Sequence, residues 1–350
     1  TFEQTSKGFI KDQELTTKMH VNHLSNDLGH DISRWNIQQT AVTSHETDLG
    51  IIDSEIGYLG SFYQINKRND GFTKTGDVAR ANLHASVGWR QYYNYIINEK
   101  SLIIEPKIKL TFIEGDDKNN DIPNRDSTDF RIDSANMFLT NRFQGYDYVL
   151  PGARADIGLS AFTNSQFLGS LHGFAGVSRR HSGDVPSGLS SGTDTDLSDY
   201  VATSSAEKNN LYAFSWSGRL NSTSSNLDES RTKLSTKLQN ASFTIAHTQL
   251  TQNYFTSANS DLEEASISIS QRLKNGVSMR ASQNWDLSDS DVNRDKSSFI
   301  VSWSNGLQDC LTISLRYDRD PEIDRDIKTT ETYQLLLNFK YLGGVPYDSN

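Results

Sequence analysis

Acidic side chains gather in the middle of the chain, and their chemistry would be metal binding or acid–base catalysis. Carboxylate oxygens are calcium ligands, and a pair of carboxylates provides the acid and the base of a glycosidase. The spacing matches no EF-hand loop, and acidic loops are common on a chain whose net charge is -10. The favoured interpretation is charge on solvated loops. The residues are Glu114, Asp116, Asp117, Asp121, Asp126, Asp129 and Asp133.

Other residues with metal-binding or catalytic chemistry form no complete pattern. His20, His23 and His30 suggest a metal cluster, but on a strand His20 and His23 face opposite sides. Asp194-x-Asp196-x-x-Asp199 lies in a Gly/Ser-rich stretch and is not a full ligand set. We find no Ser/His/Asp order, no Gly-rich phosphate loop and no Cys-x-x-Cys. The sequence therefore predicts neither enzyme activity nor a cofactor nor a metal centre.

The least ordinary stretch is Ile122 to Leu159, which is polar, rich in Asn, Asp and Arg, and too long for a turn. Loops of this length between strands are usually functional or disordered. Aromatic side chains within the stretch can pack it down, and we therefore expect it to be ordered. They are Phe130, Phe138, Phe143, Tyr146 and Tyr148.

The elements that flank this stretch alternate between apolar and polar residues. Such a period of two predicts strands with one apolar face, and it recurs along the whole chain without a helical period. The aromatic content of 10% and the low count of 6 Pro also suit an all-β protein. The flanking apolar residues are Leu102, Ile104, Ile108, Leu110 and Phe112 before the stretch, and Ala155, Ile157, Leu159 and Ala161 after it.

Connections between the predicted strands alternate in length. Lys274–Gly276 and Gln239–Asn240 are short, whereas 251–262 and 287–296 are long. Transmembrane β-barrels have short periplasmic turns, long outward loops and an even number of strands, and we count about sixteen strands. The polar face carries too many charges to fill a closed core, because an unpaired buried charge costs several kcal/mol. The sequence therefore predicts an antiparallel transmembrane β-barrel with its apolar side chains outward; a large antiparallel sandwich is the alternative.

The totals exclude other classes. A net charge of -10 argues against nucleic acid as a partner. The chain contains no run of about 18 apolar residues, so the sequence predicts no transmembrane helix. The first residues, TFEQTSKGF, lack the apolar stretch of a signal peptide, so the chain is expected to be mature or a fragment of a longer one.

The polar stretch carries ordered residues in a pattern that resembles the LPS-assembly outer-membrane protein family LptD, also called organic solvent tolerance proteins, especially its alphaproteobacterial forms. The runs are N-R-D-S, F-x-x-D-x-x-N-x-F, N-R-F-x-G-Y-D and G-A-R-A-D-I-G. One departure is Tyr148, where the family more often has Arg. The matching residues are Asn124, Asp126, Ser127, Phe130, Asp133, Asn136, Phe138, Asn141, Arg142, Phe143, Gly145, Tyr146, Asp147, Gly152 and Arg154.

Similarity to this family extends beyond the stretch, to 198–202, 309–315 and 335–343. The resemblance implies that residues 1–350 form one outer-membrane β-barrel domain, part of a larger barrel, with a long extracellular loop at about 113–152. A periplasmic jelly-roll domain and the first barrel strands would lie upstream.

The resemblance also implies a function, which is insertion of lipopolysaccharide into the outer leaflet of a Gram-negative outer membrane. The implied partners are lipopolysaccharide, outer-membrane lipid, an LptE-like plug lipoprotein and an LptA-like periplasmic bridge that acts through the jelly roll. A diffusion porin or substrate-specific channel is the alternative, and a soluble β-sandwich enzyme is a third.

Site residues follow from the same resemblance. The last strand would form one side of a lateral seam for lipid, with Tyr333, Leu335, Leu337, Phe339 and Tyr341. Cys310 stands where the family has a cysteine paired with one upstream, but Asp309 precedes a single cysteine here, where many relatives have two. By residue type alone, Cys310 is a small buried residue or an unpaired thiol.

Overall fold

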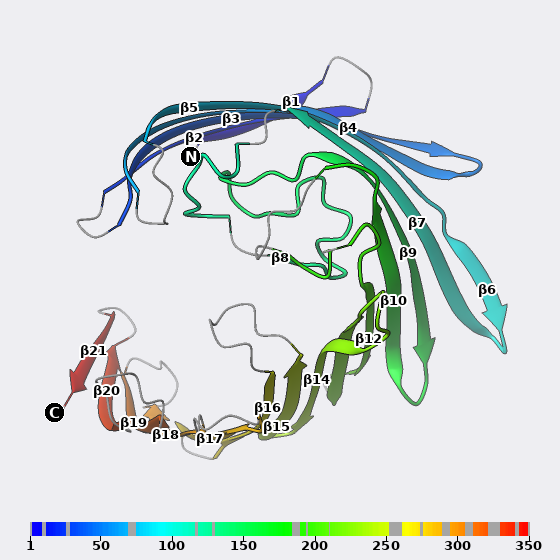
Figure 1. The fold of residues 1–350 in the computed structure, drawn as a ribbon. Helices are drawn as coiled ribbons and strands as arrows, with labels where there is room; N and C mark the ends of the chain where they lie inside the picture. Colours follow the sequence, from blue (N-terminus) through cyan, green and yellow to red (C-terminus); the bar gives the residue numbers. More distant parts are fainter. Residues whose placement is uncertain are drawn as a thin grey trace. The chain divides into compact units, whose positions relative to one another are not determined.

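A computed structural model of the chain shows strands and, within the residues it describes, no α-helix (Figure 1). None of these residues forms a helix long and apolar enough to span a membrane. The described residues are 2–8, 12–25, 29–68, 75–115, 118–127, 130–183, 190–193, 195–209, 211–251, 261–273, 276–288, 295–304, 311–320, 330–339 and 343–348.

The strands follow one another along the chain as an antiparallel meander. Their bounds are β1 Phe2–Lys7, β2 Gln13–Leu24, β3 Asp31–Thr47, β4 Gly50–Lys67, β5 Gly76–Arg90, β6 Tyr93–Ile97, β7 Lys100–Gly115, β8 Phe130–Arg131, β9 Gly152–Ser165, β10 Gly169–Arg180, β11 Ser190–Ser191, β12 Tyr200–Lys208, β13 Tyr212–Leu220, β14 Leu227–Leu238, β15 Ala241–Leu250, β16 Leu262–Arg272, β17 Val277–Asp286, β18 Lys296–Ser304, β19 Leu311–Asp320, β20 Thr330–Phe339 and β21 Gly343–Asp348.

Within the described residues, nineteen of these strands belong to one sheet, and β8 pairs with β11 in a second, parallel sheet of two. Both β5 and β6 pair with β7, so the nineteen correspond to eighteen when β5 and β6 are counted as one interrupted strand. The pairing breaks near Pro106 of β7, which has no N–H to donate. There the backbone N–H of Gln91 donates to the Pro106 carbonyl at 3.3 Å. The predicted all-β antiparallel class is confirmed.

The count exceeds the predicted number of about sixteen strands because alternation does not mark the two terminal strands. β1 (FEQTSK) holds a single apolar residue, and β21 (GGVPYD) contains two glycines and a proline. Backbone pairing with a neighbour makes them strands, since β1 pairs with β2 and β21 pairs with β20 along their lengths.

Two compact units divide the chain. Unit 1 comprises Thr1–Phe162, Gly173–Ala202 and Arg219–Ser225, and unit 2 comprises Thr163–His172, Thr203–Gly218 and Asn226–Asn350. Each is described by itself below.

In unit 1 many polar side chains of the strands are buried and many of the large apolar ones are exposed. On β5, Arg80, Asn82 and His84 are 3%, 2% and 9% exposed, whereas Leu83 and Val87 are 61% and 53% exposed. Successive residues of a strand point to opposite faces, so the predicted alternation sets both faces at once. The apolar face is the exposed one, as the inside-out arrangement predicts.

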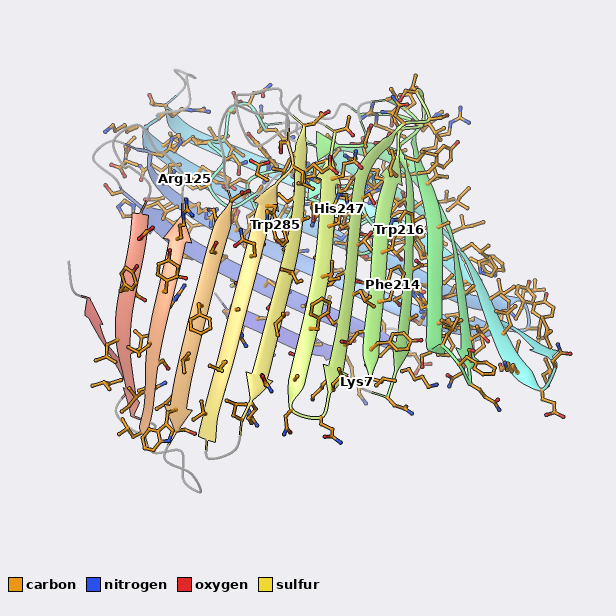
Figure 2. The ribbon with its side chains drawn as sticks, turned by 90° about the horizontal axis from the view of Figure 1, so that it is seen from below. Lys7, Arg125, Phe214, Trp216, His247 and Trp285 are labelled. Atoms are coloured by element: carbon orange, nitrogen blue, oxygen red, sulfur yellow. The ribbon has the colours of Figure 1, made fainter. Side chains whose placement is uncertain are left out.

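Unit 2 also carries large apolar side chains at its surface. Met279, Phe299 and Leu315 are 37%, 43% and 62% exposed. The labelled Trp285 of β17 is another and is 40% exposed (Figure 2).

The buried apolar clusters of unit 1 all include residues of the polar stretch. One joins strand residues to Ile122, a second is built on Ile132 and Met137 with Val201, and a third on Phe143 and Leu150. The expected ordering of this stretch is thus achieved by apolar contacts of its own. The strand residues of the first cluster are Ile32, Tyr63, Ile65 and Val78.

Candidate functional site

The candidate site is the central segment, defined here as residues 118–151, of which 118–127 and 130–151 are described. It connects β7 to β9 and lies on the concave side of the strands of unit 1 (Figure 1). Buried charged side chains from these strands contact polar motif residues of the segment. Three groups of contacts hold it in place.

Asp147 is the centre of the first group. One carboxylate oxygen accepts hydrogen bonds from Arg34 Nη1 of β3 at 2.9 Å and from Tyr63 Oη of β4 at 3.0 Å. The other oxygen accepts from the backbone N–H groups of Arg125 at 2.7 Å and Asp126 at 3.1 Å. Asp147 is 1% exposed and Arg34 5%, so this is a buried ion pair, and both carboxylate oxygens of Asp147 accept hydrogen bonds.

The backbone around Asp147 is held by a further strand and by the N-R-D-S run. Arg80 of β5 donates to the carbonyl of Asp147 at 2.7 Å and also to that of Tyr146. Ser127 Oγ accepts from the N–H groups of Asp147 at 3.0 Å and Tyr148 at 2.9 Å. Two distant runs of the motif therefore fold onto each other.

Asp126 is part of the same group. Its carboxylate lies 2.8 Å from Arg34 Nη1 and accepts from the N–H of Tyr146 at 3.1 Å. The interpretation of the acidic cluster as solvated charge is thus wrong for this residue. Asp116, Asp117 and Asp129 lie outside the described residues.

Gly145 allows the segment to pass close to Asp126. Its φ is +86°, in the region that only glycine adopts readily, and a Cβ there would lie 2.5 Å from Asp126 Oδ1. Asn124 closes the adjacent turn, because its side chain bonds both the N–H and the carbonyl of Ser127, at 3.0 and 2.5 Å.

We predict that Gly145→Ala destabilises the segment by about 2 kcal/mol, from backbone strain and the clash with Asp126. The measurement is amide hydrogen exchange of the detergent-solubilised protein, with faster exchange expected in the segment. Gly88→Ala is the matched control, because its Cβ would meet no atom closer than 3.6 Å. Equal exchange in both variants would contradict the prediction.

The second group surrounds Asp156 of β9, which is 0% exposed. Arg142 Nη2 donates to Asp156 Oδ1 at 2.6 Å and to the Met137 carbonyl at 3.0 Å, and Ser178 Oγ of β10 donates to the same carboxylate oxygen at 2.6 Å. Arg154 Nε lies 3.3 Å from the other oxygen. Arg142 therefore ties the segment to two strands at once.

The third group contains Glu55 of β4 and Lys109 of β7. Thr140 Oγ1 donates to Glu55 Oε2 at 2.8 Å, and Lys109 Nζ donates to the Phe138 carbonyl at 2.9 Å. His84 Nε2 of β5 lies 3.2 Å from the other Glu55 oxygen. Arg154 also donates to the Thr140 carbonyl, at 2.8 Å.

Three other predicted motif residues, Asp133, Asn136 and Asn141, form hydrogen bonds within the segment. Asp133 Oδ1 accepts from the Asn136 N–H at 2.8 Å, and Asn136 Oδ1 accepts from the Asp133 N–H at 2.9 Å. Asn141 donates to the Tyr148 carbonyl at 3.2 Å. Phe138 packs edge-on against Phe174 of β10, at 6.3 Å between ring centroids.

Burial shifts the pKa values of two charged groups in the segment, Arg142 and Asp147. It lowers the pKa of Arg142 to about 10, with the Arg154 charge adding to the effect, and Arg142 stays charged at neutral pH. Burial and the Asp126 carboxylate raise the pKa of Asp147, against the opposing charge of Arg34.

The strand residues that hold the motif, chiefly Arg34, Tyr63 and Arg80, were not predicted from the sequence. Each is a large polar residue on the polar face of a strand, and this is a usable signal, but alternation does not say which loop such a residue meets. Among the described residues, no three His, Cys, Asp or Glu side chains form a group that could hold a metal ion. The contacts themselves join the segment to the strands, and what they do is position it.

The seam residues lie differently from the prediction. Tyr333, Leu335 and Leu337 belong to β20, which pairs with β19 on one edge and with β21 on the other, so β20 is not the last strand. Phe339 ends β20, and Tyr341 lies outside the described residues, as does Cys310.

Solved outer-membrane proteins resemble the chain weakly. A substituted Rhodopseudomonas blastica porin matches with a TM-score of 0.32 and 10% identity, over 96% of this chain and 98% of the porin. The copper transporter OprC matches with a TM-score of 0.40 and 12% identity, over 95% of this chain and 63% of OprC. No curated protein matches the chain.

A family model described as "LptD: LPS transport system D" matches residues 1–276, which include all three contact groups of the central segment. The similarity predicted for 309–315 and 335–343 lies beyond this match. The resemblance drawn from the polar stretch is confirmed, and the chain belongs to the LptD family.

Proposed function

We propose that this chain is the outer-membrane barrel part of a translocon that inserts lipopolysaccharide into the outer leaflet of a Gram-negative outer membrane. The observation that carries the proposal is the family match over residues 1–276. In this region the motif residues form buried contacts with the strands. Asp126, Asp147 and Arg142 are the residues that fasten the central segment to the strands.

The exposed apolar face of the strands supports a place in lipid. Large side chains such as Leu83, Leu110 and Ile157 are 61%, 57% and 51% exposed, and acyl chains would remove them from water. The central segment belongs to the outward side in this proposal, because long loops of bacterial barrels face outward.

The proposed partners follow from family membership. They are lipopolysaccharide itself, surrounding outer-membrane lipid, an LptE-like plug lipoprotein, and an LptA-like periplasmic bridge that acts through a jelly-roll domain. A lateral seam would involve the terminal strands, with β21 rather than β20 at the C-terminal edge of the described chain. Cys310 is the proposed disulfide partner of an upstream cysteine.

Depletion of the protein from cells is expected to strand newly made lipopolysaccharide in the inner membrane. The measurement is pulse-labelling of lipopolysaccharide followed by separation of the two membranes. Re-expression of the protein from a plasmid is the control and should restore delivery. Normal arrival of lipopolysaccharide in depleted cells, together with ion conductance of the purified protein, would favour the porin alternative.

A further inference from the structure

The polar face of β14 to β18 in unit 2 carries positive charges at its turn end and hydroxyl groups beyond them. These strands lie side by side in antiparallel register (Figure 2). Residues opposite one another therefore form rows across the sheet, and every second residue of a strand stays on the same face. These rows therefore show which polar side chains of different strands lie next to one another.

One row near the short turns runs from Lys237 through Ser242 and Ser270 to Arg280. Arg272 lies two residues along from Ser270, on the same face, and is directly opposite Ser278. Three inter-strand spacings separate Lys237 from Arg280, which is about 14 Å. The three cations are thus spread over neighbouring strands of one sheet face.

A hollow of about 550 Å³ opens at these rows. Lys237, Arg272 and Arg280 line it together with hydroxyl-bearing residues, with amide side chains and with the apolar Met279 and Ile300. None of its described lining residues is Asp or Glu. Guanidinium and ammonium groups donate strong hydrogen bonds to phosphate oxygens. The hollow is therefore complementary in charge to a phosphate-bearing ligand.

The next row on the same face consists entirely of hydroxyl side chains across five strands. Two of them pair at 3.1 Å, Ser235 Oγ with Thr244 Oγ1. Hydroxyl groups both donate and accept, so they suit the hydroxyls of a sugar. A protein interface core would instead be rich in aromatic and other apolar residues. The row is Ser235, Thr244, Ser268, Ser282 and Ser298.

We propose that Lys237, Arg272 and Arg280 form a binding site for the phosphate groups of a phosphorylated saccharide, with the adjoining hydroxyl row contacting its sugars. The inference rests on the proposed function and deepens it, because it assigns to a named face the saccharide part of the lipopolysaccharide. The turn end would be the periplasmic end of the strands, where such a ligand enters.

The test measures binding of lipid-free, phosphorylated core oligosaccharide, made by deacylating lipopolysaccharide, to the purified chain in detergent. A phosphatase-treated sample of the same oligosaccharide is the comparison ligand. We expect the phosphorylated form to bind at least about tenfold more tightly at low salt, and the difference to shrink as salt screens the charges.

The variant Lys237→Gln/Arg272→Gln/Arg280→Gln is expected to lose that tenfold preference. The matched control, Arg231→Gln/Lys233→Gln/Lys296→Gln, removes the same charge from the far end of the same face and should keep it. Circular dichroism checks that both variants remain folded. If the first variant misfolds, Arg280→Gln alone should still lose part of the preference.

Equal binding of both oligosaccharides by the unaltered protein, or an unchanged preference in the first variant, would overturn the proposal. The first variant could instead lose a co-purifying acidic polypeptide while its oligosaccharide binding stays unchanged. That result would assign the three cations to a protein contact and would also overturn the proposal. These outcomes are distinct from failure of the proposed function, which the depletion experiment reports.

Discussion

Asp147→Ala is expected to release the central segment from β3, β4 and β5. The substitution removes a carboxylate that accepts four hydrogen bonds and leaves Arg34, which is 5% exposed, with the Asp126 carboxylate and the neutral ring of His20 as its partners. Breaking a buried ion pair by removing one partner costs about 3 kcal/mol or more, because the other charge stays buried. We therefore expect local opening of the segment to become about a hundredfold more frequent.

The measurement is hydrogen exchange followed by mass spectrometry on peptides from the central segment. Asp133→Ala is the control, because Asp133 is exposed and its carboxylate is bonded only to nearby backbone. It should change exchange by much less. Exchange in Asp147→Ala that matches the unaltered protein would show that the Asp147 contacts do not hold the segment.

Arg142→Met is the second substitution with a large expected effect. Arg142 and Asp156 are 5% and 0% exposed, and their closest atoms are 2.6 Å apart. The variant leaves the Asp156 charge buried with Ser178 and with Arg154 at 3.3 Å. We expect a loss of about 3 kcal/mol, measured by urea unfolding in detergent.

A double-mutant cycle with Asp156→Leu tests whether this loss comes from the unpaired charge. The double variant should be less destabilised than the sum of the two single variants, by about 1–3 kcal/mol. Arg180→Met is the control, since its partner Asp196 lies 3.8 Å away and has a side chain that is 84% exposed. Exposed pairs of this kind contribute little. Strict additivity in the cycle would argue against a coupled pair.

Both experiments test how the central segment is held in position against the strands. Buried ion pairs fasten the segment to β3 and β9, and hydrogen bonds join it to β4, β5, β7 and β10. The family motif is the part of the sequence that provides this fastening. The phosphate site proposed in unit 2 uses other residues, namely Lys237, Arg272 and Arg280. Defects in the two regions should therefore separate, with altered segment exchange in one set of variants and altered oligosaccharide binding in the other.

The sequence by itself determined most of the strands and the two faces of each of them. In β5, Leu83 and His84 are neighbours, and alternation alone placed one outward and the other inward, as their exposures of 61% and 9% show. The motif also identified the family, and its aromatic residues predicted that the polar stretch would be ordered. These features are local, because a strand repeats every two residues and a motif is a linear pattern.

Only the tertiary structure decided which distant residues meet. Nothing in the pattern around Arg34 indicates Asp147, which is 113 residues away, and nothing in β1 or β21 marks a strand until β2 and β20 pair with it. A buried carboxylate selects whichever donors the folded sheet brings within about 3 Å, and backbone pairing accepts almost any side chains. Those choices depend on the arrangement of the whole sheet, which no local pattern contains.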